Sequence, residues 1–206
     1  MSKRQQMSET LHSPKPKPKE KDIGPENTRR EAILRAAYEI FAKYGFKRTT
    51  MDDIAKEAGV SRPALYQLFA NKREIFRKIV EAHITHVFIE LETLLTADKS
   101  DDGSSPQSLI RAILVTALIE PHRLLENMPH GEELLGIKTE IAGDLFQDWE
   151  TRLQTIIHRA LIKSHPSDRT PALTKVISLA ITGLKTRNLS ADQMDQEIES
   201  LIEIVG

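Results

Sequence analysis

Residues 61–72 combine side chains whose chemistry suits the base edges of double-stranded DNA. Arg62 can donate two hydrogen bonds to guanine, and Gln67 can make a bidentate contact with adenine. Pro63 and Ala64 offer apolar surface to a thymine methyl group. A segment that carries all four of these side chains could therefore distinguish one base pair from another.

The same segment supplies groups that could bind phosphates. The polar side chains spaced to reach the DNA backbone are those of Ser61, Tyr66 and Lys72. Backbone amides at helix N-termini would add to them, because the positive end of the helix dipole attracts anions. In a purely structural helical bundle, by contrast, Tyr66 would belong partly to the core and Lys72 would only be solvated.

Two short helices joined by a glycine turn are predicted to position these side chains. Thr50 is a suitable N-terminal cap for the first, and Ser61 for the second, which runs from residue 62 to about 69. Gly59 lies between them, where a tight turn requires a positive φ. Such a pair forms a helix-turn-helix, whose second helix enters the major groove.

A preceding helix, predicted from Thr28 to residue 44, would brace this pair. Thr28 can cap it, with Glu31 three residues later, and Gly45 can close it. Its apolar stripe recurs at helical spacing and comprises Ile33, Leu34, Ala37, Ile40, Phe41 and Tyr44.

Charge is distributed unevenly along the 206 residues, although the net charge is only −1. Residues 1–77 contain 17 Lys and Arg against 10 Asp and Glu, whereas residues 78–206 contain 12 against 20. A basic front half favours contact with a polyanion. Proline alternates with lysine between Pro14 and Lys19, so residues 1–26 are predicted to form a disordered basic tail. This tail could follow phosphates or a minor groove, or have only a nonspecific effect.

Residues 49–76 resemble the DNA-binding signature of the TetR/AcrR family of bacterial repressors, and residues 30–37 resemble that family's first helix. The matched positions are Gly45, Thr49, Thr50, Ile54, Ala55, Ala58, Gly59, Val60, Ser61, Leu65, Tyr66, Phe69 and Lys72. The resemblance implies that Thr50 caps its helix near a phosphate. It further implies phosphate contacts from Ser61, Tyr66 and Lys72, and base contacts from Arg62, Pro63, Ala64 and Gln67.

Two positions depart from the family pattern. Pro63 stands where the family often has glycine, and Leu68 stands where an aromatic residue or histidine is common. The first departure could alter how closely the backbone approaches DNA, and the second could remove a polar contact. The preferred DNA sequence therefore cannot be transferred from relatives.

Apolar patterns predict further helices at about 72–97, 106–120, 132–163, 170–187 and 191–205, with no alternating strand segment. We therefore expect an all-α protein: a tail at 1–26, a three-helix headpiece at 27–78, and a helical regulatory and dimerisation domain at 79–206. The resemblance implies a homodimer through about residues 170–205. The apolar stripes of those helices are Leu173, Val176, Ile177, Ala180, Ile181 and Leu184, and Met194, Ile198, Leu201, Ile202 and Val205. Alternatively, these stripes only close the monomer core.

The resemblance also implies a small-molecule pocket in the body. The candidate lining residues are His83, Val87, Leu114, Leu118, His122, Met128, Phe146 and Trp149. His83 could instead be a satisfied core histidine. His83 and His86 could lie close together, but the absence of cysteine and of a third ligand argues against a metal site. Pro121 could break a helix at the edge of the pocket.

No nucleophile elbow, phosphate loop, zincin motif or dinucleotide turn occurs, so neither an enzyme nor a cofactor is predicted. The lack of a long apolar run or signal peptide predicts a cytoplasmic protein. The expected function is a sequence-specific transcriptional regulator, a repressor released from a palindromic operator by a small-molecule effector. The alternatives are a ligand-independent DNA binder, an activator, and a structural helical adaptor.

Overall fold

The computed structural model describes residues 25–97, 106–163, 168–187 and 189–205. Within these ranges every regular element is helical, which confirms the all-α prediction. The predicted basic tail, apart from its last two residues, lies outside the described residues. No helix in the described ranges is long and apolar enough to cross a membrane.

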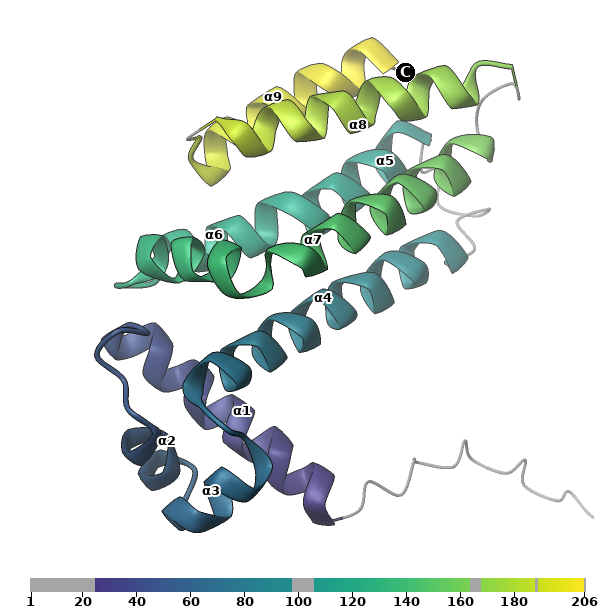
Figure 1. Ribbon diagram of the computed structural model, residues 1–206. Helices are drawn as coiled ribbons and strands as arrows, with labels where there is room; N and C mark the ends of the chain where they lie inside the picture. Colours follow the sequence, from purple (N-terminus) through teal and green to yellow (C-terminus); the bar gives the residue numbers. More distant parts are fainter. Residues whose placement is uncertain (1–24, 98–105, 164–167, 188, 206) are drawn as a thin grey trace, which may run out of the picture.

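The headpiece consists of α1 (Pro25–Tyr44), α2 (Met51–Glu57) and α3 (Arg62–Leu68), at one end of the molecule (Figure 1). Its core contains three aromatic rings, Phe41, Phe46 and Phe76, whose centroids lie between 5.3 and 5.7 Å apart. The predicted cap at Thr28 is wrong, because α1 already begins at Pro25. A proline is tolerated there since the N–H groups of a first turn have no helical acceptor.

Helix α4 (Lys72–Thr96) leaves the headpiece and runs along α7 (Gly131–Ile162) in the body (Figure 1). Its buried side chains are Ile75, Phe76, Val80, Ile84, Val87, Phe88, Leu91 and Leu95. The first of these pack in the headpiece and the last in the body. A displacement of α4 relative to the body must therefore move the headpiece as well.

The body has three layers (Figure 1). Helix α4 forms the first, and α7 lies beside α5 (Pro106–Leu114) and α6 (Glu120–Glu126) in the second. Helices α8 (Thr170–Thr186) and α9 (Ala191–Val205) cover the far side, with α8 against α7 and α9 against α5. The predicted helical segments of the body are thus confirmed in type and approximate extent.

The predicted break at Pro121 is wrong, because α5 continues into α6 through one π-helical turn, η1 (Val115–Ile119). The N–H of Glu120 donates to the carbonyl of Val115, and Pro121 follows in the first turn of α6. Proline cannot donate a helical hydrogen bond, and the wider turn before it absorbs that loss without ending the helix.

Candidate nucleic-acid interface and effector cavity

Thr50 caps α2, as predicted. Its Oγ1 accepts a hydrogen bond from the Asp53 N–H at 3.2 Å, and an Asp53 carboxylate oxygen accepts from the Thr50 N–H at 2.9 Å. The hydrogen bond from the Thr50 hydroxyl is the main cause that lowers the pKa of Asp53. This reciprocal pair is a capping box, which fixes the residue at which α2 begins.

The turn between α2 and α3 also has the predicted geometry. Gly59 adopts a φ of +65°, in the left-handed region that side chains disfavour. Ser61 then caps α3, because its Oγ accepts from the Ala64 N–H at 3.3 Å. Pro63 lies in the first turn of α3, where no helical donor is lost.

Helix α3 buries Leu65 and exposes the side chains predicted to meet bases. Arg62, Pro63, Tyr66 and Gln67 are all exposed, and only Ala64 is partly buried. The arrangement can therefore present a hydrogen-bonding surface to a groove of DNA.

Arg62 has a partner within the headpiece. Its Nη1 lies 2.9 Å from Oδ2 of Asp52 in α2, and its guanidinium lies 5.5 Å from the centre of the Tyr66 ring. Both members of the ion pair are more than half exposed. Because exposed ion pairs contribute little free energy, a guanine base could take the place of Asp52.

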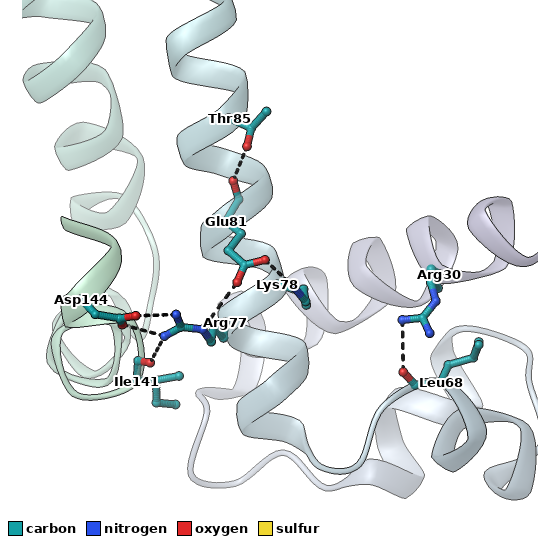
Figure 2. Close-up of polar contacts among 8 residues, drawn as sticks. All are labelled: Arg30, Leu68, Arg77, Lys78, Glu81, Thr85, Ile141 and Asp144. Atoms are coloured by element: carbon teal, nitrogen blue, oxygen red, sulfur yellow. Dashed lines mark hydrogen bonds and ion pairs between the residues drawn. The ribbon is translucent and has the colours of Figure 1, made fainter. Parts of the chain in front are cut away.

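Arg30 of α1 holds the end of α3, a role that the sequence did not reveal. Its Nη1 donates to the carbonyl of Leu68 at 3.2 Å (Figure 2). Its guanidinium also lies 5.3 Å from the centre of the Phe69 ring. The last carbonyls of a helix lack partners within the helix, so a cation there stabilises it. Arg30 therefore helps to orient the helix that carries the candidate base contacts.

Lys72, predicted to contact a phosphate, holds backbone carbonyls of the headpiece. Its Nζ donates to the carbonyls of Phe46 and Thr49 at 2.8 Å and of Lys47 at 3.2 Å. An ammonium group has three protons, so in this conformation none is left for a phosphate. Lys72 therefore links the loop between α1 and α2 to the start of α4, and its phosphate contact stays a prediction.

The first half of α7 holds the headpiece against the body at three points. The contacts are Lys47 N–H to Glu133 Oε1 at 2.7 Å, Arg73 to Glu140 at 2.6 Å, and Arg77 to Asp144 at 2.6 Å. All three headpiece partners belong to the loop after α1 or to the start of α4. A movement of this part of α7 is therefore transmitted to the headpiece through polar contacts.

Arg77 makes the most extensive of these contacts (Figure 2). Its two terminal nitrogens donate to the two oxygens of Asp144 at 2.7 and 2.6 Å, and Nη1 also donates to the carbonyl of Ile141 at 3.0 Å. That carbonyl lies beside a kink in α7 at Ala142, whose φ and ψ of −130° and 20° are not helical. The hydrogen bonds from Arg77 hold the pKa of Asp144 down to about 2, so the pair stays ionised at neutral pH.

A cavity of about 790 Å³ lies in the body, between α4, η1, α6 and α7. The structure brings seven of the predicted lining residues to it: His83, Val87, Leu118, His122, Met128, Phe146 and Trp149. The eighth, Leu114, is fully buried in the core. Tyr38 and Phe41 of α1 also reach the cavity wall, so the headpiece contributes to it directly. This volume is in the range that holds a small molecule.

His83 faces this cavity and has no hydrogen-bond partner among the described residues, so it is not a satisfied core histidine. Burial, and then the charge of Lys138, lower the pKa of His83. His86 instead pairs with Glu90, with Nε2 and Oε1 3.2 Å apart. The described part of the chain holds no group of three or more His, Asp or Glu side chains that could bind a metal ion.

An exposed, capped helix-turn-helix on an all-helical body defines a DNA-binding transcriptional regulator. Residues 33–79 match the family model described as bacterial regulatory proteins, tetR family. This region of the chain is therefore a DNA-binding domain of the TetR type, as the resemblance of residues 49–76 to the TetR/AcrR family implied.

Relatives in sequence are also regulators. The HTH-type transcriptional activator FasR of Mycolicibacterium smegmatis is 40% identical over 63 residues, which cover 31% of this chain and 29% of FasR. An uncharacterized HTH-type transcriptional regulator of Mycobacterium tuberculosis is 27% identical over 176 residues, 82% of this chain and 84% of that protein. The stronger identity is thus confined to less than a third of FasR, whereas the weaker one spans most of both chains.

Solved structures share the fold. A TetR/AcrR-family regulator of Thermobifida fusca superimposes with a TM-score of 0.57 at 21% identity, covering 87% of this chain and 97% of that one. The SmeT–triclosan complex superimposes with a TM-score of 0.55 at 18% identity, covering 86% and 90%. FasR, the Mycobacterium tuberculosis relative and the Thermobifida fusca neighbour are named transcriptional regulators and not enzymes, in agreement with the prediction.

Proposed function

We propose that this protein is a cytoplasmic repressor that binds a palindromic operator as a homodimer and is released by a small-molecule effector. One observation carries the proposal: the first half of α7 lines the cavity and also holds the headpiece. Leu134, Lys138 and Thr139 contribute to the cavity wall, while Glu133 and Glu140 on the same segment contact the headpiece. A ligand that displaces this segment must therefore strain or break the headpiece contacts.

In the proposed DNA complex, α3 lies in the major groove. Arg62 and Gln67 contact base edges, Pro63 and Ala64 offer apolar surface, and the exposed Tyr66 contacts a phosphate. The capped starts of α2 and α3, at Thr50 and Ser61, lie near further phosphates. Lys72 and Arg30 have a different role, because they hold the headpiece in the conformation that presents this face.

The proposed dimer uses α8 and α9, but through a narrower surface than the sequence suggested. Much of the predicted stripes closes the monomer core instead; the buried members are Ile177, Ile181, Leu184, Met194, Ile198 and Ile202. The neighbouring face exposes Val176, Leu179 and Ile204, which are 48%, 64% and 80% accessible. Burying these side chains against a second copy would remove apolar surface from water.

We also propose that the domain boundary lies near residue 78, with 27–78 as the headpiece and 79–206 as the body. This boundary lies inside α4, so the two parts are joined by continuous helix. Release of DNA then requires an effector that binds more tightly to the dimer geometry in which the two headpieces no longer match the half-site spacing. The SmeT structure, a complex with triclosan, supports a ligand role for bodies of this fold.

A second candidate function is activation of transcription. A stretch of 63 residues of this chain is 40% identical to part of FasR, which is named an activator. A helix-turn-helix dimer can act as a repressor or as an activator, because its effect on transcription depends on where the DNA site lies relative to the promoter.

The test begins with selection of bound sequences from a random double-stranded DNA pool, at about physiological salt so that nonspecific binding is weak. An inverted repeat is expected for the parent protein. Tyr66→Ala should weaken binding to all sequences, and Arg62→Ala should relax the preference at one position. A reporter gene with the selected site overlapping its promoter then separates the two roles. Lower output with the protein present supports repression, and higher output supports activation.

A further inference from the structure

We propose that the cavity binds an amphipathic anion, with an apolar body and a single carboxylate-type head that pairs with Lys138. The inference rests on the proposed role of this cavity as the effector site and names the chemical class of the effector. It follows from the charges in the wall, from which of them already have partners, and from the apolar surface around them.

The charged groups of the wall are all basic. Among the described residues that line the cavity there is no Asp or Glu, whereas Lys138, Lys185 and Arg187 are present together with His83 and His122. The chain as a whole has 30 Asp and Glu against 29 Lys and Arg, so this imbalance is local. A cavity with this wall would repel a cationic ligand and attract an anionic one.

Most of these basic groups have a partner in the protein. Lys185 pairs with Glu150 at 2.6 Å, and Arg187 pairs with Glu197 at 2.9 Å. The Nε2 of His122 lies 3.0 Å from the carbonyl of Leu189. A ligand would have to compete with these groups for each of those contacts.

Lys138 is different, because no described residue accepts a hydrogen bond from it or forms an ion pair with it. Its Nζ lies 4.7 Å from the centre of the Phe146 ring, so the ammonium group lies over an aromatic face. Burial, and then the charge of Lys185, lower the pKa of Lys138 to about 8. A partly buried ammonium without a counter-ion is costly, and a carboxylate in the cavity would remove that cost.

The rest of the cavity wall is mostly apolar, so the part of the ligand away from its charged head should be apolar as well. Val87, Leu118, Phe146 and Trp149 come from three different parts of the chain to line a volume of about 790 Å³. One unpaired cation in such a wall matches one negative charge. His83, which is also unpaired, could donate a second hydrogen bond to the same head from a neutral ring.

The experiment uses the full chain without DNA and two matched sets of probes in calorimetric titrations. The first set is decanoate, decan-1-ol and decylammonium, below their micelle-forming concentrations, and the second is 2-naphthoate and 2-naphthalenemethanol. At least one carboxylate should bind about tenfold or more tightly than its neutral analogue, since charge-assisted hydrogen bonds are the stronger kind. Decylammonium should bind more weakly than both of its analogues. For the decyl set, quenching of Trp149, the one tryptophan of the sequence, provides a second readout.

Variants decide whether Lys138 is the group responsible. Lys138→Met should abolish the preference for the carboxylate over the alcohol while keeping affinity for the alcohol, and Lys138→Arg should retain the preference. Lys175→Met removes an exposed lysine of α8 outside the cavity wall and should behave as the parent. Equal affinity for carboxylate and alcohol in both sets, or a preference that survives Lys138→Met, would overturn the proposal. Because no DNA is present, these results are independent of whether binding releases an operator.

Discussion

Two lysines, one at the start of α4 and one in α7, have opposite surroundings. Lys72 donates all three of its protons to backbone carbonyls of the headpiece. Lys138 borders the cavity and donates to no described residue. The first lysine stabilises a conformation, whereas we expect the second to lower stability in the absence of a ligand. The comparison teaches that one chain combines a headpiece whose buried polar groups are paired with a body whose cavity holds an unpaired cation.

The largest effect is expected from removal of the satisfied lysine. Lys72→Met leaves three carbonyls without their charged donor and should lower the free energy of unfolding by about 2–3 kcal/mol. Urea denaturation followed by circular dichroism measures this loss. Affinity for DNA should fall for all sequences alike, because the headpiece loses its brace. A variant as stable as the parent would show that the three contacts are not what holds the loop.

Removal of Lys138 should stabilise the protein, whereas removal of Lys72 should destabilise it. Lys138→Met relieves the cost of a partly buried charge and should raise the free energy of unfolding at pH 7 by about 1–3 kcal/mol. The folded pKa of about 8 lies below the ordinary value of 10.5, so the parent gains stability as pH rises between these values. The advantage of the variant should therefore shrink over that interval. A destabilised Lys138→Met at pH 7 would contradict the comparison.

The loss of the Lys138 proton should also change the affinity for a carboxylate ligand. Because Lys138 must be protonated to pair with a carboxylate, affinity for decanoate should fall about tenfold between pH 7 and pH 9, as the lysine of the free protein loses its proton. Affinity for decan-1-ol should stay constant over the same range, which makes it the control. A pH-independent ratio of the two affinities would exclude Lys138 as the charged partner.

The smallest effect concerns the link between the two regions. Asp144→Asn keeps the shape of the side chain but removes the charge that pairs with Arg77. Since this contact is exposed, the thermal midpoint should change little. The ratio of the DNA affinity without ligand to the DNA affinity with ligand should fall roughly two- to fivefold, because the coupling passes partly through this contact. An unchanged ratio would show that the coupling does not pass through the Arg77–Asp144 contact.

The headpiece was predictable in detail because its signals are local. Thr50, Gly59 and Ser61 each determine a cap or turn through atoms within a few residues, and all three have the predicted geometry. Thr28 failed because a cap residue does not prevent a helix from beginning earlier, at a proline that suits a first turn. The carbonyl partners of Arg30 and Lys72 lie more than 20 residues away, beyond any local pattern.

The body was predictable in its helices and less so in what their faces contact. Apolar periodicity placed Ile177 and Ile198 on buried stripes but could not show that they face their own core. The resemblance placed a pocket in the body, and packing brings seven of its eight candidate lining residues to one cavity. Lys138 was missed because a lysine on a helix indicates solvent exposure unless the surrounding fold is known.

The most direct test of effector-controlled DNA binding is a titration of decanoate, or of 2-naphthoate if it binds more tightly, into the complex of the protein with its selected inverted-repeat DNA. Fluorescence anisotropy of labelled DNA measures release. The parent should release DNA at concentrations that match its affinity for the carboxylate, and Lys138→Met should need about tenfold more carboxylate for the same release. If the parent binds the carboxylate and stays on the DNA, the cavity does not control the headpiece in the proposed way.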